Sequence, residues 1–543
     1  MEELEGMVTE SLEKQLYLKE SPKDEGLYIY NTITGEKELF KPKVAGKVAM
    51  YFCGITPYDE SHVGHARSMV AFDILYRYFQ YLGYNVTYVR NFTDVDDKII
   101  HRATELNKDI LTVSSRYSQK FLDDMNDLQC LPPTHEPRVS EHIDQIIDMI
   151  NQIISNDCAY TVDGNVYFSI DKFPNYGRLS RRKLEENIPG KRVDVDFRKQ
   201  NPADFALWKA AKTGEPSWDS PWGPGRPGWH IECSAMSSQY LTFTFDIHGG
   251  GQDLIFPHHE NEIAQSWAAC SDSNVTYWMH IGSANLNGEK MSKSKGNFIS
   301  IREALEWYHP LALRHFLMSM HYRSPINLLK PQLKKASSPV NFSMTQLENA
   351  SNSVFYIYQT LQDCEVAISQ FWEGSLKEGA ESDVKRGGIT VDAQNCINGL
   401  HGDFHTKMLD DFQTPPILSA ALPEALKFVN KCLSQIKKQQ KQQGLSLIRS
   451  LIEIEKELKE VLNILGLLSP LSYSKVLGEL KDKALKRADL EEEKVLKLIK
   501  EREEARKERD FSRGDQIRRD LAARGIALMD LGTETIWRPC VPE

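Results

Sequence analysis

The chain has 543 residues, of which 41% are hydrophobic and 26% are charged, and its formal net charge is −10. This is the composition of an ordinary globular protein of several domains, which excludes collagen-like and low-complexity classes. The net negative charge disfavours non-specific binding to polyanions, so a nucleic-acid partner would have to be bound by local basic faces. From residue 472 to the C-terminus the charges balance more closely, with 17 Lys+Arg against 16 Asp+Glu.

The N-terminal segment and the cysteines predict a cytoplasmic protein with no membrane partner. No apolar run approaches the roughly 20 residues needed to cross a bilayer. The first ten residues are acidic and have neither the apolar core of a signal peptide nor an Arg-rich transit pattern. Nine cysteines are scattered without the spacing of a secreted disulfide framework. The composition predicts no oligomeric state.

Strand-like and helix-like segments alternate in the first part of the chain. Apolar runs at Val48–Phe52 and Val86–Val89 predict buried strands, and amphipathic stretches at Ala66–Leu82 and Asp96–Leu106 predict helices. Such alternation is typical of a Rossmann-like, doubly wound parallel α/β sheet. Tyr277–Ile281 is then expected to be the last strand of the sheet.

The remaining segments predict an insertion and two further domains. The insertion, about 118–224, contains a strand candidate at Asn165–Ser169 and ends in a Pro/Gly/Trp-rich segment. The expected domains are an N-terminal extension (1–26), an α/β domain (27–330), a helical bundle (331–475, interrupted near 373–388) and a small mixed α/β domain (476–543). In the last domain we expect a helix at Ser512–Arg524 and a strand at Ile526–Met529.

Two short segments suit phosphate chemistry. His62-Val-Gly-His65 lies between a predicted strand and a predicted helix, where unpaired N–H groups and the helix dipole favour an anion. Lys290-Met-Ser-Lys-Ser294 lies between two glycines and predicts a flexible loop that brings Lys290 and Lys293 onto a departing pyrophosphate. Either segment alone is ordinary, because short histidine motifs occur by chance and Lys/Ser loops are usually solvated. In this order they resemble the two signatures of class I aminoacyl-tRNA synthetases.

Four other residues form a candidate zinc set. Cys53 ends the first predicted strand, Cys233 lies much later, and His258 and Glu262 share one face of a predicted helix. Two thiolates, an imidazole and a carboxylate are ligands that zinc prefers. Taken singly, each is better interpreted as a buried structural residue, and His259 is a rival ligand on spacing alone.

Longer segments around these residues resemble cysteinyl-tRNA synthetases. They are Tyr51–Gly54, Asn91–Ile100, Pro227–Met236, Asp246–Gly251 and Asp253–Gln265. The resemblance runs from about Leu27 to the C-terminus and is most specific in the catalytic half. It implies that Cys53, Cys233, His258 and Glu262 hold one Zn²⁺ and that the substrate sulfur joins them. Zinc would be useful because ordinary pocket contacts separate near-isosteres such as cysteine and serine by only roughly 1–3 kcal/mol.

The resemblance also implies a reaction and its site residues. The reaction is ATP-dependent ligation of L-cysteine to cysteine tRNA through a cysteinyl adenylate. His62, His65, Lys290 and Lys293 would stabilise charge on the phosphates of ATP, together with Mg²⁺. The implied nucleotide-binding residues are Gly64, Gly249, Gly250, Gly251, Met291 and Ser292, and the implied amino-acid pocket is Thr56, Thr93, Trp229, His248 and Asp253. A tight turn after a strand explains the three consecutive glycines equally well.

The helical bundle and the last domain are expected to bind tRNA. Trp537 is then either a residue that stacks on an anticodon base or a buried structural tryptophan. Two other functions stay open: a ligase that transfers cysteine from its adenylate to a small amine, and a non-catalytic RNA-binding paralogue. The residues that depart from the family pattern are Pro57, Val63, Ile281, Ser283 and Lys295.

Overall fold

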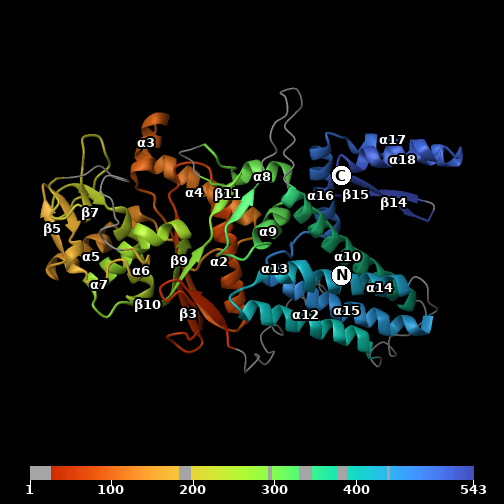
Figure 1. The fold of residues 1–543 in the computed structure, drawn as a ribbon, viewed down its shortest axis with the longest axis horizontal. Helices are drawn as coiled ribbons and strands as arrows, with labels where there is room; N and C mark the ends of the chain where they lie inside the picture. Colours follow the sequence, from red (N-terminus) through yellow and green to blue (C-terminus); the bar gives the residue numbers. More distant parts are fainter. Residues whose placement is uncertain are drawn as a thin grey trace.

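The computed structural model describes residues 26–182, 197–291, 296–328, 345–376, 388–436, 441–532 and 534–542. Figure 1 shows an α/β region, a helical bundle beside it and a small C-terminal unit that packs next to the bundle. Within these ranges, every helix is too short or too polar to cross a membrane.

A four-stranded parallel sheet forms the centre of the α/β region, with the order β10-β9-β3-β4. The strands are β3 (Lys47–Ile55), β4 (Asn85–Phe92), β9 (Thr244–Gly251) and β10 (Asn274–Ile281). The predicted parallel sheet is therefore confirmed. The strand order reverses between β3 and β9, and open α/β sheets bind ligands beside such a reversal, at the carboxyl edge.

Alternation along β3 decides which face of the sheet carries which residue. Val48, Met50 and Phe52 belong to the core beneath α2, whereas Tyr51 and Cys53 belong to the core on the opposite face. The helices that contact the sheet are α2 (Val63–Tyr81) on the first face and α6 (Trp229–Leu241) on the second, where α6 packs against α5 (Ile143–Ser155) and α7 (Glu260–Ala269). Cys53 therefore belongs to the face of the sheet that carries α6 and α7.

The segment between β4 and α6 forms a separate antiparallel sheet of four strands, β5-β6-β7-β8. These are β5 (Ala159–Val162), β6 (Asn165–Phe168), β7 (Phe205–Ala210) and β8 (Gly225–Pro227). Two helices precede it, α3 (Asp97–Leu106) and α4 (Ile110–Asp127). The strand expected at Asn165–Ser169 is β6. The expected insertion, 118–224, does not begin or end in a loop. Its first residue lies inside helix α4, and its last residue directly precedes strand β8, which pairs with β7.

A hairpin of β1 (Tyr28–Asn31) and β2 (Glu36–Leu39) lies beside β10, where the Thr32 N–H donates to the Trp278 carbonyl at 2.8 Å. After β10 come β11 (Ala284–Leu286) and β12 (Glu289–Lys290), and β11 also pairs with β13 (Ile326–Leu328). Two short helices lie between them, α8 (Ile301–Trp307) and α9 (Pro310–Met318). This unit connects the sheet to the bundle.

The bundle shares one continuous apolar core with the α2 face of the sheet. Its helices are α10 (Thr345–Leu376), α12 (Val391–Leu409), α14 (Leu422–Ile436) and α15 (Lys441–Ile464), with a short α13 (Thr414–Pro416). Most of the interruption predicted near 373–388 lies outside the described residues. The shared core makes the sheet and the bundle one packed body.

The C-terminal unit has a small core of its own. Its elements are α16 (Tyr473–Ala488), α17 (Glu492–Lys507), α18 (Phe511–Ala522), β14 (Ile526–Leu531) and β15 (Glu534–Pro539). The first half of α16 packs in the large core and its second half packs in the small one. The predicted helix and strand correspond to α18 and β14. The second strand, β15, pairs antiparallel with β14 and was not predicted.

Candidate active site

The first signature forms the N-terminus of α2 at the carboxyl edge of the sheet. His62 is the N-cap residue, and its backbone N–H donates to Nδ1 of His65 at 3.2 Å. The two imidazole rings stack with centroids 3.9 Å apart. A Cβ atom on Gly64 would lie 2.7 Å from the His62 ring, so this close approach needs glycine. Both imidazoles therefore lie at the positive end of a 19-residue helix, where an anion is favoured.

The segment after the second signature packs against the first. The Val63 N–H donates to the Ile299 carbonyl at 3.0 Å, and His62 forms a β-bridge with Ser300. Lys290 ends β12, and its Nζ lies 3.2 Å from the Asp253 carboxylate. Met291 is buried, whereas Ser292 and Lys293 lie outside the described residues. The fold thus brings the start of the lysine loop and the histidine segment to one edge of the sheet.

The four predicted metal ligands meet in one buried cluster. The Sγ atoms of Cys53 and Cys233 are 3.6 Å apart, and Cys53 Sγ lies 3.5 Å from Glu262 Oε1. His258 Nε2 is 3.2 Å from the same carboxylate oxygen. One ligand atom from each residue lies within 4.8 Å of all the others, a spacing that fits a single ion. All four side chains are at most 6% exposed.

A second quartet overlaps this cluster. Cys53 and Glu262 also lie within 4.8 Å of His248 and His259, so the rival ligand His259 is within reach of the same ion, although its Nε2 is 3.8 Å from Glu262 Oε1. Two thiolates match zinc better than one, which favours the quartet that contains Cys233. His230 supports the same quartet, because its Nδ1 lies 2.9 Å from Nδ1 of His258 and leaves Nε2 of His258 facing the cluster.

Burial disfavours a charge on two of the four side chains, Cys53 and His258. Burial raises the pKa of the Cys53 thiol well above its ordinary value, and burial lowers the pKa of His258 well below its ordinary value. A low-dielectric site of this kind disfavours an uncompensated charge on either side chain. A divalent cation would reverse that preference, so the donor set fits a metal ion.

The residues expected around the amino acid come from several elements. Thr56 and Thr93 directly follow β3 and β4, at the carboxyl edge. Trp229 begins α6, and its ring stacks on His258 with centroids 4.3 Å apart. His248 Nε2 lies 3.1 Å from Glu262 Oε2. Asp253 is exposed and pairs with Lys290. The set therefore extends from the buried cluster to the lysine loop.

The three consecutive glycines lie in a strand and not in a turn. Gly249, Gly250 and Gly251 form the end of β9 and pair with Met279, His280 and Ile281 of β10. A Cβ atom on Gly249 would lie 2.4 Å from the Phe52 ring and 2.7 Å from the Met279 carbonyl. The turn interpretation is thus wrong, and close strand packing accounts for Gly249.

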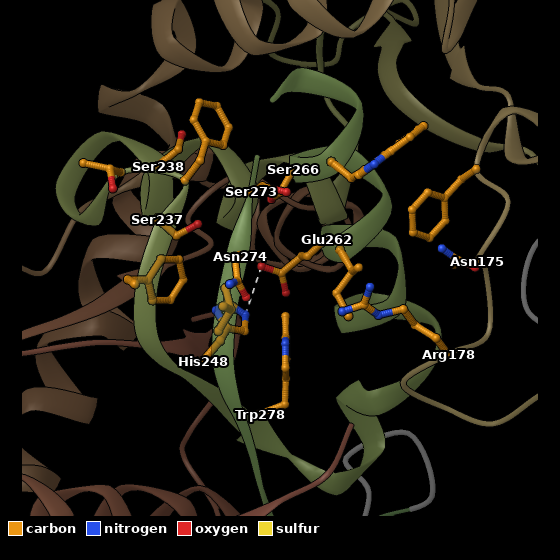
Figure 2. Close-up of a pocket in the computed structure, with 17 residues that line it drawn as sticks. Asn175, Arg178, Ser237, Ser238, His248, Glu262, Ser266, Ser273, Asn274 and Trp278 are labelled. Atoms are coloured by element: carbon orange, nitrogen blue, oxygen red, sulfur yellow. Dashed lines mark ion pairs between the residues drawn. The ribbon is translucent and has the colours of Figure 1, made fainter. Parts of the chain in front are cut away.

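A cavity of about 120 Å³ lies behind the cluster, between α6, α7 and the first residues of β9 and β10. Figure 2 shows His248 and Glu262 beside this cavity, with Arg178 extending toward it from the insertion. Polar side chains of Ser237, Ser266 and Asn274 also line it. The cluster therefore borders a space on the side away from the carboxyl edge.

The sequence did not single out Asn91, His230 or His280, although all three contact the site. His280 Nε2 lies 2.7 Å from His259 Nδ1, and Asn91 Oδ1 accepts from the Gly54 N–H at 2.9 Å. Asn91 and His230 lie inside segments that carry the family resemblance, and this position was the one signal in the sequence that could have pointed to them. Their contacts arise from strand pairing and helix packing, which the residue spacing alone does not reveal.

Trp537 is a structural residue of the C-terminal core. Its side chain is 4% exposed, and its Nε1 donates to Glu492 at 3.3 Å. Of the two interpretations of Trp537, the structure supports the buried tryptophan. Phe511 at the start of α18 is instead 58% exposed, next to Arg509 and Arg513, which are also exposed.

The fold and this site define a class I aminoacyl-tRNA synthetase. A family model described as tRNA synthetases class I (C) catalytic domain matches residues 39–338, and one described as cysteinyl-tRNA ligase anticodon binding domain matches residues 488–538. Among solved structures, the fold is similar to Mycobacterium tuberculosis methionyl-tRNA synthetase in complex with methionyl-adenylate. That similarity has a TM-score of 0.53 at 16% identity and covers 79% of this chain and 93% of the other.

Curated relatives narrow the class to one family. The chain is 56% identical over 519 residues to a chloroplastic/mitochondrial cysteine–tRNA ligase of Oryza sativa subsp. japonica, covering 95% of this chain and 86% of that one. It is 56% identical over 516 residues to a cytoplasmic cysteine–tRNA ligase of Arabidopsis thaliana (95% and 97%). It is 46% identical over 518 residues to a cysteine–tRNA ligase of Pelobacter propionicus (94% and 99%). The chain belongs to the cysteine–tRNA ligase family. Since relatives of equal identity come from different compartments, the cytoplasmic location stays a prediction.

Proposed function

We propose that the protein ligates L-cysteine to cysteine tRNA through a cysteinyl adenylate, at the expense of ATP. The observation that carries this proposal is that Cys53, Cys233, His258 and Glu262 meet in one buried cluster, in a sheet whose carboxyl edge also carries a helix N-terminus that suits phosphate. An amino-acid site and an anion site at the same sheet edge are what adenylate formation requires.

Selection of cysteine is assigned to the metal cluster. A bound zinc ion would supply a soft Lewis acid whose bond to a thiolate a serine hydroxyl cannot match. The protein side chains hold the ligand atoms within 4.8 Å of one another and exclude water, since all four are buried. Trp229 covers His258 by stacking. Thr56, Thr93, His248 and Asp253 complete the proposed pocket.

Activation of cysteine is assigned to the two signature segments. The carboxylate of the substrate attacks the α-phosphorus of ATP, a step in which the enzyme positions the reactants and stabilises charge. His62 and His65 would bind phosphate oxygens at the N-terminus of α2, with Mg²⁺ accompanying ATP. Lys290 and Lys293 would approach the departing pyrophosphate. Gly64, Gly249, Gly250, Gly251, Met291 and Ser292 would contact the nucleotide.

Binding of tRNA is assigned to the C-terminal half. We keep the division into a catalytic domain (27–330), a bundle that binds tRNA (331–475) and an anticodon-recognition domain (476–543). The match of residues 488–538 to an anticodon-binding family model supports the last of these. The exposed Phe511 replaces Trp537 as the proposed base-stacking residue, because stacking requires an accessible ring.

The test is amino-acid-dependent exchange of pyrophosphate into ATP, compared for cysteine and serine, followed by aminoacylation of transcribed cysteine tRNA. We expect exchange with cysteine, little exchange with serine, and loss of the cysteine signal after treatment with a zinc chelator. Exchange without aminoacylation would indicate transfer to a small amine. Absence of exchange in protein that contains zinc would indicate a non-catalytic paralogue.

A further inference from the structure

Asn91 connects three parts of the site through one buried amide. It lies on β4 and is 1% exposed. Its Oδ1 accepts from the Gly54 N–H at 2.9 Å and lies 3.7 Å from Cys233 Sγ. Its Nδ2 donates to the Thr93 hydroxyl at 3.3 Å. The amide therefore contacts the strand that carries Cys53, the side chain of Cys233 and a residue of the proposed amino-acid pocket.

The contact with Gly54 follows from an irregularity in the sheet. The register of β3 on β4 shifts between Phe52 and Ile55, so the Gly54 N–H bonds to a side chain in place of a strand partner. A Cβ atom on Gly54 would lie 1.6 Å from the Asn91 backbone oxygen, which excludes any larger residue there. The bulge thus places the Asn91 amide directly beside the residue that follows Cys53.

We propose that Asn91 is a positioning residue that fixes Cys53 and Cys233 relative to Thr93, so that metal affinity and the choice of cysteine over serine depend on the same side chain. This inference rests on the proposed function. Side chains in the layer around metal ligands orient those ligands, and their loss typically lowers metal affinity or activity by roughly 10–100-fold.

A purely structural role would need only the bond to Gly54. An unpaired buried N–H is costly, and one carbonyl oxygen satisfies it. The same Oδ1 also lies 3.7 Å from Cys233 Sγ, and Nδ2 donates to the Thr93 hydroxyl, so the amide contacts both sides of the site. A structural role predicts that loss of the Asn91 amide lowers only the free energy of unfolding. A positioning role predicts that it also lowers the affinity for zinc.

Asn31 provides a matched control. It is 2% exposed and also bridges strands, since its amide donates to the Thr276 carbonyl at 2.9 Å and accepts from the Trp278 N–H at 3.0 Å. It is thus a buried asparagine of the same domain whose amide bonds to two backbone atoms and to the Glu38 carboxylate at 3.1 Å, and to none of the candidate metal ligands. Asn91→Ala and Asn31→Ala should cost similar free energies of unfolding.

The experiment measures zinc affinity of the full chain by competition with a chromophoric chelator, without substrates. We expect Asn91→Ala to weaken zinc binding roughly 10–100-fold and Asn31→Ala to leave it within about twofold. The spectrum of the Co²⁺-substituted protein should change in Asn91→Ala alone. In exchange assays at saturating zinc, Asn91→Ala should raise KM for cysteine and lower the cysteine/serine ratio of kcat/KM.

Thr93→Val separates the effect of Asn91 on metal affinity from its effect on the binding of cysteine. It removes the hydroxyl that Asn91 contacts but no candidate metal ligand, so it should raise KM for cysteine and leave zinc affinity unchanged. The effects of Asn91→Ala and Thr93→Val on KM should be less than additive, because they break one shared contact. Equal zinc affinity in wild type, Asn91→Ala and Asn31→Ala would overturn the inference. Failure of the wild type to bind zinc would instead overturn the proposed function.

Discussion

At the scale of single residues, two overlapping quartets compete for one ion. We expect Cys233→Ser and His258→Ala to reduce zinc content from roughly one per chain to near zero, and His259→Ala to retain it. The reason is that only the first quartet has two thiolates, and that His258 Nε2 lies closer than His259 Nε2 to Glu262 Oε1, at 3.2 Å against 3.8 Å. Elemental analysis of purified variants measures this. Zinc retained in Cys233→Ser but lost in His259→Ala would assign the ion to the other quartet.

A substitution of Lys293 tests whether the phosphate site and the metal cluster act separately. Lys293→Ala should lower adenylate formation by orders of magnitude, because it removes charge from the departing pyrophosphate, and it should leave zinc content intact. Lys290, the other lysine of the loop, forms an exposed ion pair with Asp253. Asp253→Asn removes this ion pair without removing a lysine, and its exchange rate can be compared with that of Lys293→Ala. ATP–pyrophosphate exchange gives the rate and elemental analysis gives the metal. An unchanged exchange rate would remove Lys293 from the proposed catalytic set.

The sequence predicted which residues could bind a metal ion, but it did not decide which of two adjacent histidines is the ligand. Cys53, Cys233 and the pair of His258 and Glu262 come from three separate places in the chain and meet in the fold. Spacing could not decide between His258 and His259, because adjacent residues on a short π-helical turn both reach Glu262. Asn91 was not predicted, because its role depends on a register shift between β3 and β4.

At the scale of elements, regular periodicity was a reliable guide and short polar strands were not. The apolar runs of β3 and β4 predicted the parallel sheet, since strands buried on both faces are continuously hydrophobic. Strand β15 has the pattern exposed, half-buried, exposed, buried, and begins with polar residues, so its sequence gives little strand signal. Because β15 carries Trp537 into the small core, missing this strand also left the environment of Trp537 undecided.

The C-terminal unit yields a prediction about two aromatic residues. Phe511→Ala should weaken binding of cysteine tRNA roughly 5- to 150-fold, because stacking on one base contributes about 1–3 kcal/mol, and should leave stability nearly unchanged. Trp537→Ala should instead destabilise the C-terminal unit by about 3–5 kcal/mol, because it empties a core position. Filter binding and denaturant unfolding measure the two effects. Equal tRNA affinity in wild type and Phe511→Ala would exclude stacking at the start of α18.

At the scale of the whole molecule, one buried arginine joins the α/β region to the bundle. Arg314 on α9 is fully buried and forms an ion pair with Asp73 of α2. Its Nε donates to the Leu465 carbonyl at the end of α15 at 2.8 Å, and its Nη1 donates to the Leu128 carbonyl at 2.9 Å. Together with the continuous apolar core, these bonds predict that sheet and bundle unfold as one unit, separately from the small C-terminal core.

Removing Asp73 should therefore lower the stability of the larger unit alone. Asp73→Ala leaves the Arg314 charge buried without its carboxylate, which costs roughly 3–5 kcal/mol. Arg314→Met should cost less, because Asp73 still accepts from Arg77 Nε and from the Leu131 N–H, at 2.8 Å and 2.7 Å. Glu306→Ala is the control, since its ion pair with Lys486 is exposed and contributes at most about 1 kcal/mol. Denaturant unfolding should show the larger transition moving in Asp73→Ala while the smaller stays in place. A shift of both transitions together would mean that the C-terminal unit unfolds with the rest.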